Sequence, residues 1–298
     1  MKKLNDLLDY FKFLKNPITA LMFKFGLKKE CEIKLKNSPT TVKLTSVFAL
    51  NRLMNAIPYT NVEKYEELIK YIKDIDNDEE IISIDGINYY NIFNEIFKKK
   101  HAENFSIHIE EFITDDSWNT LDMNNRNIID IGANIGDTAL YFAKNGANVI
   151  AFEPVKHLYE LGVETLHLNQ NLEKKIKLIN KAVGGKRGKL DIEASSAKAY
   201  ANDSYQIEVI TVADILNDYN FPADVLKMDC EGCEFKIILN EDLTMFKDII
   251  FEHHSKLVGK DYKPLIEKLK KDGFTIDTYP VTITKQSFKE IGIIHAYK

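Results

Sequence analysis

The stretch NIIDIGANIGDTALYFA, residues 127–143, gives the clearest indication of the fold. Its first six residues are mostly apolar, which is typical of a strand buried on both faces of a parallel sheet. Gly132 and Gly136 then predict a tight turn, and the residues from Thr138 onward predict a helix. The two glycines let the backbone approach a ligand closely, and the helix N-terminus offers unpaired N–H groups to an anion. The stretch therefore predicts a nucleotide-type loop at the edge of an α/β sheet.

Downstream of this loop, short apolar runs alternate with longer amphipathic stretches, which predicts βα units that form a parallel sheet. Two closing runs, 274–281 and 291–298, are joined by a loop too short for a parallel crossover, so we expect them to pair antiparallel. Residues 188–194 and 206–212 predict an additional hairpin, with a short helix at 213–219. The other predicted strands lie at 127–132, 148–153, 175–183, 223–230 and 248–254.

Composition excludes some classes of protein. The chain has 298 residues and a formal net charge of −5, which disfavours an extended nucleic-acid surface because phosphate binding needs clustered lysine and arginine. Three cysteines are too few for a disulfide framework, so we expect a reducing compartment. The charged start excludes a signal-peptide core, and the apolar run 17–23 is too short for a transmembrane segment. We expect a cytoplasmic protein.

The spacing within the loop indicates which ligand it binds. A dinucleotide fingerprint requires G-x-G-x-x-G, whereas Asp130, Gly132, Asn134 and Gly136 spell D-x-G-x-N-x-G. Asparagine tolerates left-handed backbone angles and can replace a glycine in a tight turn. An NAD-linked oxidoreductase is therefore the weaker interpretation. Asp130 itself is either a carboxylate that caps the turn or a ligand contact, and one side chain can do both.

Glu153 ends the next predicted strand, 21 residues after Gly132, and Pro154 stops that strand. At this position an acidic side chain can accept hydrogen bonds from both ribose hydroxyls of a nucleoside. The alternative is a solvated acid at a strand end. Because the glycine loop lies upstream, the ligand role for Glu153 is favoured.

A second group of polar residues follows the fourth and fifth predicted strands. Asp229 ends the fourth strand, and Glu252, His253 and His254 end the fifth, so they should meet where open α/β sheets bind ligands. They predict either an acid–base site or a divalent-metal site with Asp229 and Glu252 as ligands. The alternative is that one histidine packs against the sheet and the other is solvated. Lys227, inside the fourth strand, should form a structural ion pair with a carboxylate of this group or of a neighbouring strand.

The pair Cys230 and Cys233 raises a different question. A Cys-x-x-Cys can be a redox dithiol or half of a zinc site. The chain contains no second pair to complete a zinc site, and its one further cysteine, Cys31, lies far away in the sequence. We therefore expect the carboxylates, not the sulfurs, to carry the chemistry.

Three motifs, DIGANIGDT (130–138), AFEP (151–154) and LKMDCEGCE (226–234), resemble the FkbM-type S-adenosylmethionine-dependent methyltransferases. The resemblance covers about residues 106–298. It implies a class I methyltransferase fold, a Rossmann-like seven-stranded sheet with an antiparallel last strand, and methyl transfer from S-adenosylmethionine to a hydroxyl of a sugar or natural product. It also implies a site for the donor, with the loop at the methionine end and Glu153 at the ribose. The cofactor-binding residues so implied are Asp130, Gly132, Ala133, Asn134, Gly136, Asp137, Thr138, Glu153, Pro154 and Ala182.

In the third motif, Lys227, Asp229, Glu231 and Glu234 match the positions of the family pattern. Asp229, with His253 or His254, is our candidate for orienting and deprotonating the acceptor. Glu231 and Glu234 are expected to support the loop or bind Lys227. A divalent metal held by Asp229 and Glu252 is left open as an alternative and is not part of the prediction. A protein that keeps the fold but only binds ligands remains an alternative, because a fold does not fix a function.

Residues 1–110 differ in pattern from the rest. Helix-rich stretches alternate with short strand-like segments, which predicts an N-terminal α+β cap or arm before a methyltransferase domain at 111–298. Lysines and aromatic residues interleave over the first 30 residues. This pattern suits an interfacial membrane helix, but packing against its own domain or a second copy in a homo-oligomer is favoured. The partner we expect is a small-molecule or glycan acceptor. The predicted helices are 3–15, 47–57, 61–76 and 92–104, and the strand-like segments are 31–37, 81–87 and 106–113.

Overall fold

The computed structural model describes residues 2–77, 79–90, 117–192, 204–281 and 287–298. Their contacts divide the chain into two compact units. Unit 1 comprises Met1–Asp116 with Thr282–Thr284, and unit 2 comprises Ser117–Val281 with Lys285–Lys298. The predicted helix 92–104, the strand-like segment 106–113 and the predicted domain boundary at 110 lie outside the described residues.

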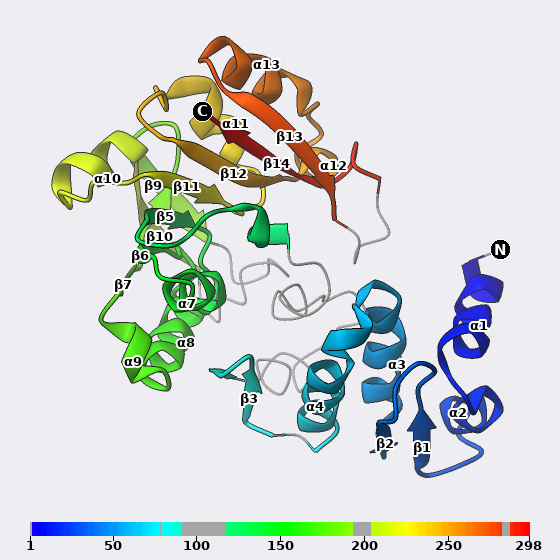
Figure 1. Cartoon of the computed structure of the whole chain (residues 1–298). Helices are drawn as coiled ribbons and strands as arrows, with labels where there is room; N and C mark the ends of the chain where they lie inside the picture. Colours follow the sequence, from blue (N-terminus) through cyan, green and yellow to red (C-terminus); the bar gives the residue numbers. More distant parts are fainter. Residues whose placement is uncertain (1, 78, 91–116, 193–203, 282–286) are drawn as a thin grey trace. The chain divides into compact units, whose positions relative to one another are not determined.

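Unit 2 contains a seven-stranded sheet in the order β13-β14-β12-β11-β5-β6-β7 (Figure 1). The five strands from β12 to β7 in this order pair in parallel, and β14 pairs antiparallel with both neighbours. This confirms the predicted class I, Rossmann-like fold with an antiparallel last strand. The strands are β5 (Asn127–Ile131), β6 (Asn148–Phe152), β7 (Ile176–Ile179), β11 (Val225–Met228), β12 (Asp248–His253), β13 (Thr275–Pro280) and β14 (Gly292–Tyr297).

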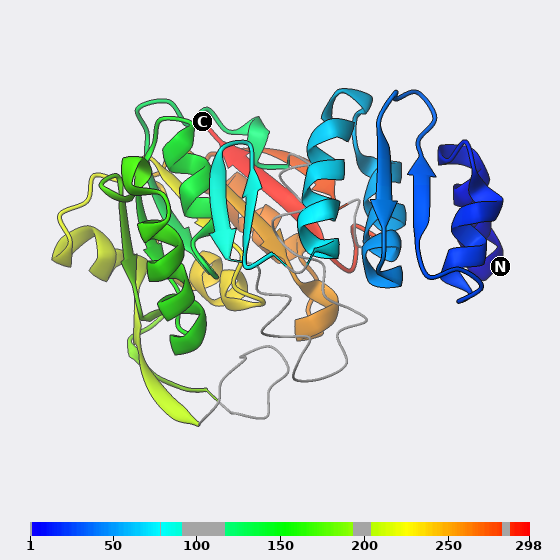
Figure 2. The same cartoon turned by 90° about the horizontal axis from the view of Figure 1, so that it is seen from below.

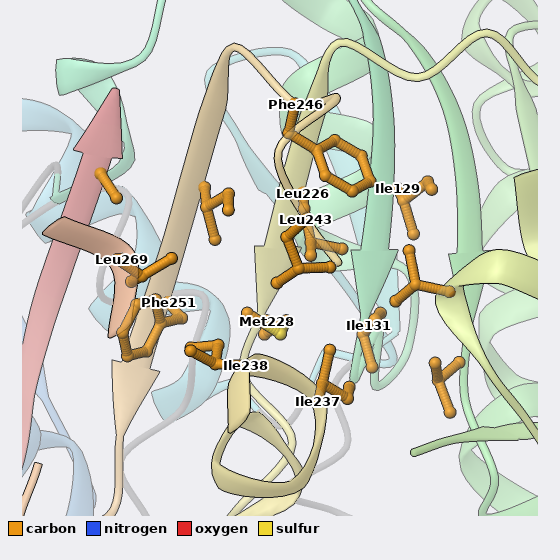
Figure 3. Close-up of a cluster of buried hydrophobic side chains, with 14 of the residues drawn as sticks. Ile129, Ile131, Leu226, Met228, Ile237, Ile238, Leu243, Phe246, Phe251 and Leu269 are labelled. Atoms are coloured by element: carbon orange, nitrogen blue, oxygen red, sulfur yellow. The ribbon is translucent and has the colours of Figure 1, made fainter. Parts of the chain in front are cut away.

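The central strands are buried on both faces because helices cover each side. One face carries an apolar core in which Leu226 and Met228 of β11 lie beside Ile129 and Ile131 of β5 (Figure 3). Ile237 of α11 (Cys233–Asn240) packs over them, and α13 (Lys263–Lys271) contacts α11. On the other face, α7 (Asp137–Lys144) contacts α9 (Gln170–Glu173), which contacts α8 (Lys156–His167). The loops at the ends of β5 and β11 are therefore held by two packed layers.

The side chains of β11 alternate between these two faces. Lys227 therefore points away from the apolar core, toward the face on which Asp130 of β5 lies. Lys227 lies opposite Asp130 in the register of β11 and β5, and its Nζ is 2.8 Å from Asp130 Oδ1. Both side chains are excluded from solvent. The aromatic ring of Trp118, in the short 3-10 helix η3 (Ser117–Thr120), lies near the same ammonium group. The predicted structural ion pair of Lys227 is confirmed, with a neighbouring strand supplying the carboxylate.

The prediction of one strand over 175–183 is wrong. The segment divides into β7 and β8 (Ala182–Val183), because Asn180 turns its side chain back and donates to the carbonyl oxygens of Glu153 and Pro154. As a result, β7 ends at Ile179, which pairs with the last residue of β6, Phe152. β8 then joins a second, three-stranded sheet in the order β8-β10-β9. There β9 (Gly188–Ile192) and β10 (Tyr205–Ile210) form the predicted hairpin, followed by α10 (Val212–Asp218).

Unit 1 is an α+β structure, as expected from its sequence. Two hairpins, β1-β2 and β3-β4, accompany its helices, and β1 and β2 lie side by side (Figure 2). The helix α2 and the strands β2 and β4 were not predicted. Tyr10 and Phe23 are buried within the unit, whereas Phe11 and Phe25 are exposed. The elements are α1 (Lys2–Phe13), α2 (Pro17–Lys24), β1 (Cys31–Lys34), β2 (Thr41–Leu44), α3 (Val47–Ala56), α4 (Tyr65–Asp76), β3 (Ile81–Ile84) and β4 (Ile87–Tyr90).

Among the described parts of the chain, no helix has both the length and the apolar character needed to cross a membrane.

The ion pair between β5 and β11 provides a test of stability. In Asp130→Asn the buried ammonium of Lys227 loses its counter-charge, so we expect the free energy of unfolding to fall by about 3–5 kcal/mol in urea titrations. The double variant Asp130→Asn/Lys227→Met removes both charges and should be more stable than the single variant. As a control, Lys256→Met breaks an exposed pair with Glu290 and should change stability by less than about 1 kcal/mol. Equal losses in the single and double variants would contradict this account.

Candidate active site

The loop between β5 and α7 has the backbone geometry that its sequence requires. Gly132, Asn134 and Gly136 have φ angles of 82°, 50° and 79°, all in the left-handed region. A Cβ added to Gly132 would lie 1.9 Å from the carbonyl oxygen of Asp229, so only glycine fits where this loop crosses the end of β11. The asparagine occupies a left-handed position, as the D-x-G-x-N-x-G spacing predicts.

Asp130, in the strand that precedes this loop, stabilises it. Its Oδ1 binds Lys227, and its Oδ2 accepts a hydrogen bond of 2.6 Å from the Thr138 hydroxyl at the start of α7. Lys227 also donates to the carbonyl oxygen of Gly132. Burial alone would lower the pKa of Lys227, but Asp130, and then Asp229, outweigh it and raise that pKa, so the lysine remains charged. Of the two roles predicted for Asp130, these contacts describe the structural one.

Glu153 joins the end of β6 to the glycine loop. Its Oε2 accepts the backbone N–H of Asn134 at 2.9 Å, and its Oε1 accepts that of Val155 at 2.8 Å. Burial raises the pKa of Glu153 to about 7, against the effect of these two N–H donors. Each carboxylate oxygen keeps a lone pair for a further donor. The side-chain oxygen of Asn134 is buried and accepts no hydrogen bond from the described residues.

The remaining residues predicted to bind the donor lie in three places. Ala133, Asp137 and Thr138 are buried in the loop and the first turn of α7. Pro154 follows Glu153, and its carbonyl oxygen accepts from the Tyr205 hydroxyl of β10. Ala182 is buried in β8, where it pairs with Val209 of β10, so it belongs to the second sheet.

Asp229, Glu252 and His254 meet at the ends of β11 and β12, as predicted, and we call them the acid–histidine cluster. One ligand atom from each lies within 4.8 Å of the others. The His254 Nε2 atom is 3.1 Å from Glu252 Oε1 and 3.9 Å from Asp229 Oδ1. Burial would lower the pKa of His254, but the hydrogen bond to Glu252 and the charges of Asp229 and Glu234 raise it to about 9. At neutral pH His254 is therefore an imidazolium.

His253 does not belong to the acid–histidine cluster, although it was a candidate. Successive side chains of a strand point to opposite faces, so His253 faces away from its two neighbours. It is fully buried, stacks on Tyr262 and contacts Phe288 and the Ser255 hydroxyl. Burial lowers the pKa of His253 to about 4, so it stays neutral. Its role is packing, which was the alternative kept open for one of the two histidines.

Glu234 is a further acidic residue that lies next to the acid–histidine cluster. Its side chain is fully buried, and its Oε1 lies 3.9 Å from His254 Nδ1 and accepts the backbone N–H of the same residue. Burial raises the pKa of Glu234. Its Oε2 accepts from the backbone N–H of Gly232. Glu234 therefore supports the loop, one of the two roles predicted for it, and is not the carboxylate that binds Lys227.

The glycine loop with Glu153 and the acid–histidine cluster both fall within one family match. Residues 130–276 match the family described as Methyltransferase FkbM domain. The chain carries an FkbM methyltransferase domain. The match begins at Asp130 and includes the glycine loop, Glu153 and the acid–histidine cluster. Methyl transfer that depends on S-adenosylmethionine is the general activity that this family supports.

Several solved structures are similar to the chain. They include methyltransferase FkbM from Methylobacillus flagellatus (12% identity, TM-score 0.44, 84% of this chain and 59% of that chain). They also include a putative transferase from Pyrococcus horikoshii (16% identity, TM-score 0.44, 79% and 83%) and TrmK from M. capricolum with S-adenosyl-homocysteine (13% identity, TM-score 0.40, 60% and 65%). The chain thus spans 59% of the length of the M. flagellatus protein. No curated protein sequence matches the chain.

The turn between β11 and α11 of the FkbM domain contains two cysteines whose state differs from the one expected. Cys230 and Cys233 are joined by a disulfide, although a reducing compartment was expected from the cysteine count. Between them, Glu231 and Gly232 have φ angles of 52° and 119°. Two consecutive left-handed residues fold the turn tightly enough to bring the sulfurs together. Cys31 is free and buried in unit 1.

The charge state of His254 can be tested by titration. We expect its ring resonances in NMR spectra to titrate with a midpoint near 9, and Glu252→Gln to lower that midpoint because it removes the main hydrogen-bond acceptor. Since the folded pKa lies above the unfolded value of 6.5, His254 contributes stability that is fully present below pH 6.5 and is lost as pH rises through 9.

The matched control for this titration is Glu173→Gln. Glu173 pairs with the exposed His167, so its loss should leave the His254 midpoint unchanged. A midpoint near 6.5 for His254 in the unmodified protein would contradict the described charge state.

Proposed function

We propose that the FkbM domain transfers a methyl group from S-adenosylmethionine to a hydroxyl oxygen of a sugar or another small metabolite. The observation that carries this proposal is the family match over residues 130–276, within which the glycine loop and the acid–histidine cluster end neighbouring strands. Ligands of open α/β sheets bind at such carboxyl ends. One group is then available for the donor and the other for the acceptor.

The residues of the loop fit the donor. The unpaired side-chain oxygen of Asn134 can accept from an ammonium group, and the first N–H groups of α7 can bind a carboxylate. These are the two charged groups at the methionine end of S-adenosylmethionine. The free lone pairs of Glu153 can accept from the two ribose hydroxyls. When bound, the donor supplies an electrophilic methyl group on a sulfonium.

The acid–histidine cluster fits the acceptor. A hydroxyl that gains a methyl group must give up its proton, and a positioned base typically contributes about 10²–10⁴-fold to the rate. His254 already carries a proton and cannot act as that base, so its role is to balance the charges of Asp229 and Glu252. Asp229 is the proposed base. Holding the acceptor oxygen in line with the methyl group supplies most of the remaining acceleration.

A divalent cation is the alternative counter-charge. Asp229 and Glu252 offer oxygen ligands of the kind that Mg²⁺ prefers, and His254 could join them only after losing its proton. Turnover measured with a chelator and then with added Mg²⁺ separates the two cases. Unchanged turnover leaves His254 as the counter-charge, whereas a loss that Mg²⁺ restores assigns a metal role to these carboxylates.

The competing functions are an NAD-linked oxidoreductase and a ligand-binding protein without catalysis. Calorimetry with S-adenosylhomocysteine and with NADH tests the first, and binding of NADH alone would overturn our proposal. Transfer of label from a methyl-labelled donor onto a panel of hydroxylated acceptors tests the second. A cell extract serves as the widest panel, because the labelled product identifies the acceptor.

For donor binding, we expect Glu153→Gln to weaken the affinity for S-adenosylhomocysteine. An amide accepts less strongly than a carboxylate, and hydrogen bonds to charged groups contribute about 1.5–3 kcal/mol, which corresponds to about 10-fold or more in Kd. Calorimetry measures the change, and thermal unfolding shows whether the variant is folded. The exposed Glu164 on α8 supplies the matched control, Glu164→Gln, which should bind normally. An unaltered Kd in folded Glu153→Gln would remove the ribose assignment.

For the chemical step, we expect Asp229→Asn to lower kcat by about 10²–10⁴-fold at saturating donor, because the amide cannot take the proton. Asp242→Asn, a change at an exposed acid of the same unit, should leave kcat unchanged. Label transfer to the acceptor identified above provides the measurement. Near-normal rates in both Asp229→Asn and His254→Ala, with and without chelator, would leave catalysis to positioning alone.

A further inference from the structure

We propose that Cys230 and Cys233 form a reversible thiol–disulfide site whose oxidation state sets the affinity of the FkbM domain for its methyl donor. The inference rests on the proposed function, because it concerns the same donor site. Both cysteines are half-buried, so a small thiol can reach them. Their Cα atoms are 5.4 Å apart, within the range that a disulfide spans.

The disulfide closes a turn whose backbone is strained. The ring that it closes contains Glu231, a non-glycine residue with a left-handed φ of 52°, and Gly232, with a φ of 119°. Left-handed angles cost energy in any residue with a Cβ. Once the bond is reduced, Glu231 can return to an ordinary backbone conformation, and the turn loses its shape.

The donor loop would respond to that change because the turn packs directly against it. A Cβ on Gly132 would lie 1.9 Å from the carbonyl oxygen of Asp229 and 3.3 Å from the Cα of Cys230. On its other side, Gly232 approaches Val258 so closely that an added Cβ would lie 2.4 Å from its Cγ1. The turn is confined between these two contacts. A shift of Cys230 therefore displaces Gly132 and the loop that follows it.

Glu234 extends the effect to the acid–histidine cluster. Its Oε2 accepts the Gly232 N–H at 2.9 Å and lies 3.4 Å from the Cys230 Sγ. After reduction, the Cys230 thiol can donate to the same oxygen and compete with Gly232. The other oxygen of this carboxylate accepts the backbone N–H of His254. The state of the sulfurs is thus coupled to both groups of the proposed site.

The exchange reaction balances with an external dithiol. A thiolate of the dithiol attacks one sulfur of the disulfide and forms a mixed disulfide with it, and the other sulfur leaves as a thiolate. The second thiol of the dithiol then displaces the attacked sulfur, so that two electrons and two protons reach Cys230 and Cys233. The dithiol leaves as a disulfide. Both sulfurs lie near the buried Glu234 carboxylate, with one ligand atom of each of the three residues within 4.8 Å of the others.

The state of the cysteines is measured first, by counting maleimide-labelled thiols in the unfolded protein. The chain has three cysteines, of which Cys31 is free, so we expect one labelled thiol before treatment with dithiothreitol and three after it. Three labelled thiols in protein prepared in air without reductant would overturn the proposal.

Donor affinity is measured next, by calorimetry with S-adenosylhomocysteine on the oxidised and the reduced protein. We expect the oxidised form to bind at least about fivefold more tightly, the lower end of ordinary coupling between sites. Coupling is reciprocal, so saturating S-adenosylhomocysteine should shift the midpoint potential of the cysteine pair by about 20 mV to more negative values.

Two variants separate this effect from a general effect of dithiothreitol. Cys230→Ser/Cys233→Ser should bind like the reduced protein and ignore the reductant, whereas Cys31→Ser should respond like the unmodified protein. If the double variant does not fold, the oxidised and reduced forms of the unmodified chain decide alone. Equal affinity in the two states would overturn the inference and leave the proposed function intact. Absence of binding in both states would contradict the proposed function itself.

Discussion

The buried ion pair between Lys227 and Asp130 is the interaction on which the arrangement of this domain depends. A lysine in the middle of a parallel strand is excluded from water, and such a charge is tolerated only with a partner close by. Asp130 meets that requirement from the adjacent strand, and its second oxygen holds Thr138 at the start of α7. One carboxylate therefore fixes a strand, a loop and a helix relative to one another.

The edge of the sheet above this pair carries mostly negative charge. Asp229, Glu252 and Glu234 lie around a single imidazolium, that of His254. Because these groups are largely excluded from solvent, their mutual interactions are stronger than they would be in water. An environment of this kind favours ligands that bring positive charge. A sulfonium donor satisfies that condition, as does a divalent cation, and a neutral hydroxyl enters without adding further negative charge.

Much of this arrangement could be predicted because parallel strands bring their carboxyl ends to one edge. From the sequence alone, that rule predicts Asp229 beside Glu252 and His254. Alternation along β12 also predicts that His253 points away from Glu252 and His254. That prediction can be made only once it is known which face of the sheet Glu252 occupies. The partner of Lys227 depends on the register between β11 and β5, which a single sequence does not encode. The disulfide depends on a left-handed φ angle at Glu231. Glutamate rarely adopts such an angle, so the sequence does not predict it.

Glu153 would make the proposed donor site sensitive to the pH of the solution. Its burial places its pKa at about 7, so at neutral pH the protein is a mixture of molecules with and without a proton on this carboxyl group. Hydroxyl groups that donate to it favour the ionised form. Occupation of the proposed ribose position would then expel protons from part of the population, and the apparent heat of binding would depend on the ionisation enthalpy of the buffer. If the proposed ribose contact forms, the same burial that holds the carboxylate between Asn134 and Val155 would make donor binding a proton-releasing event.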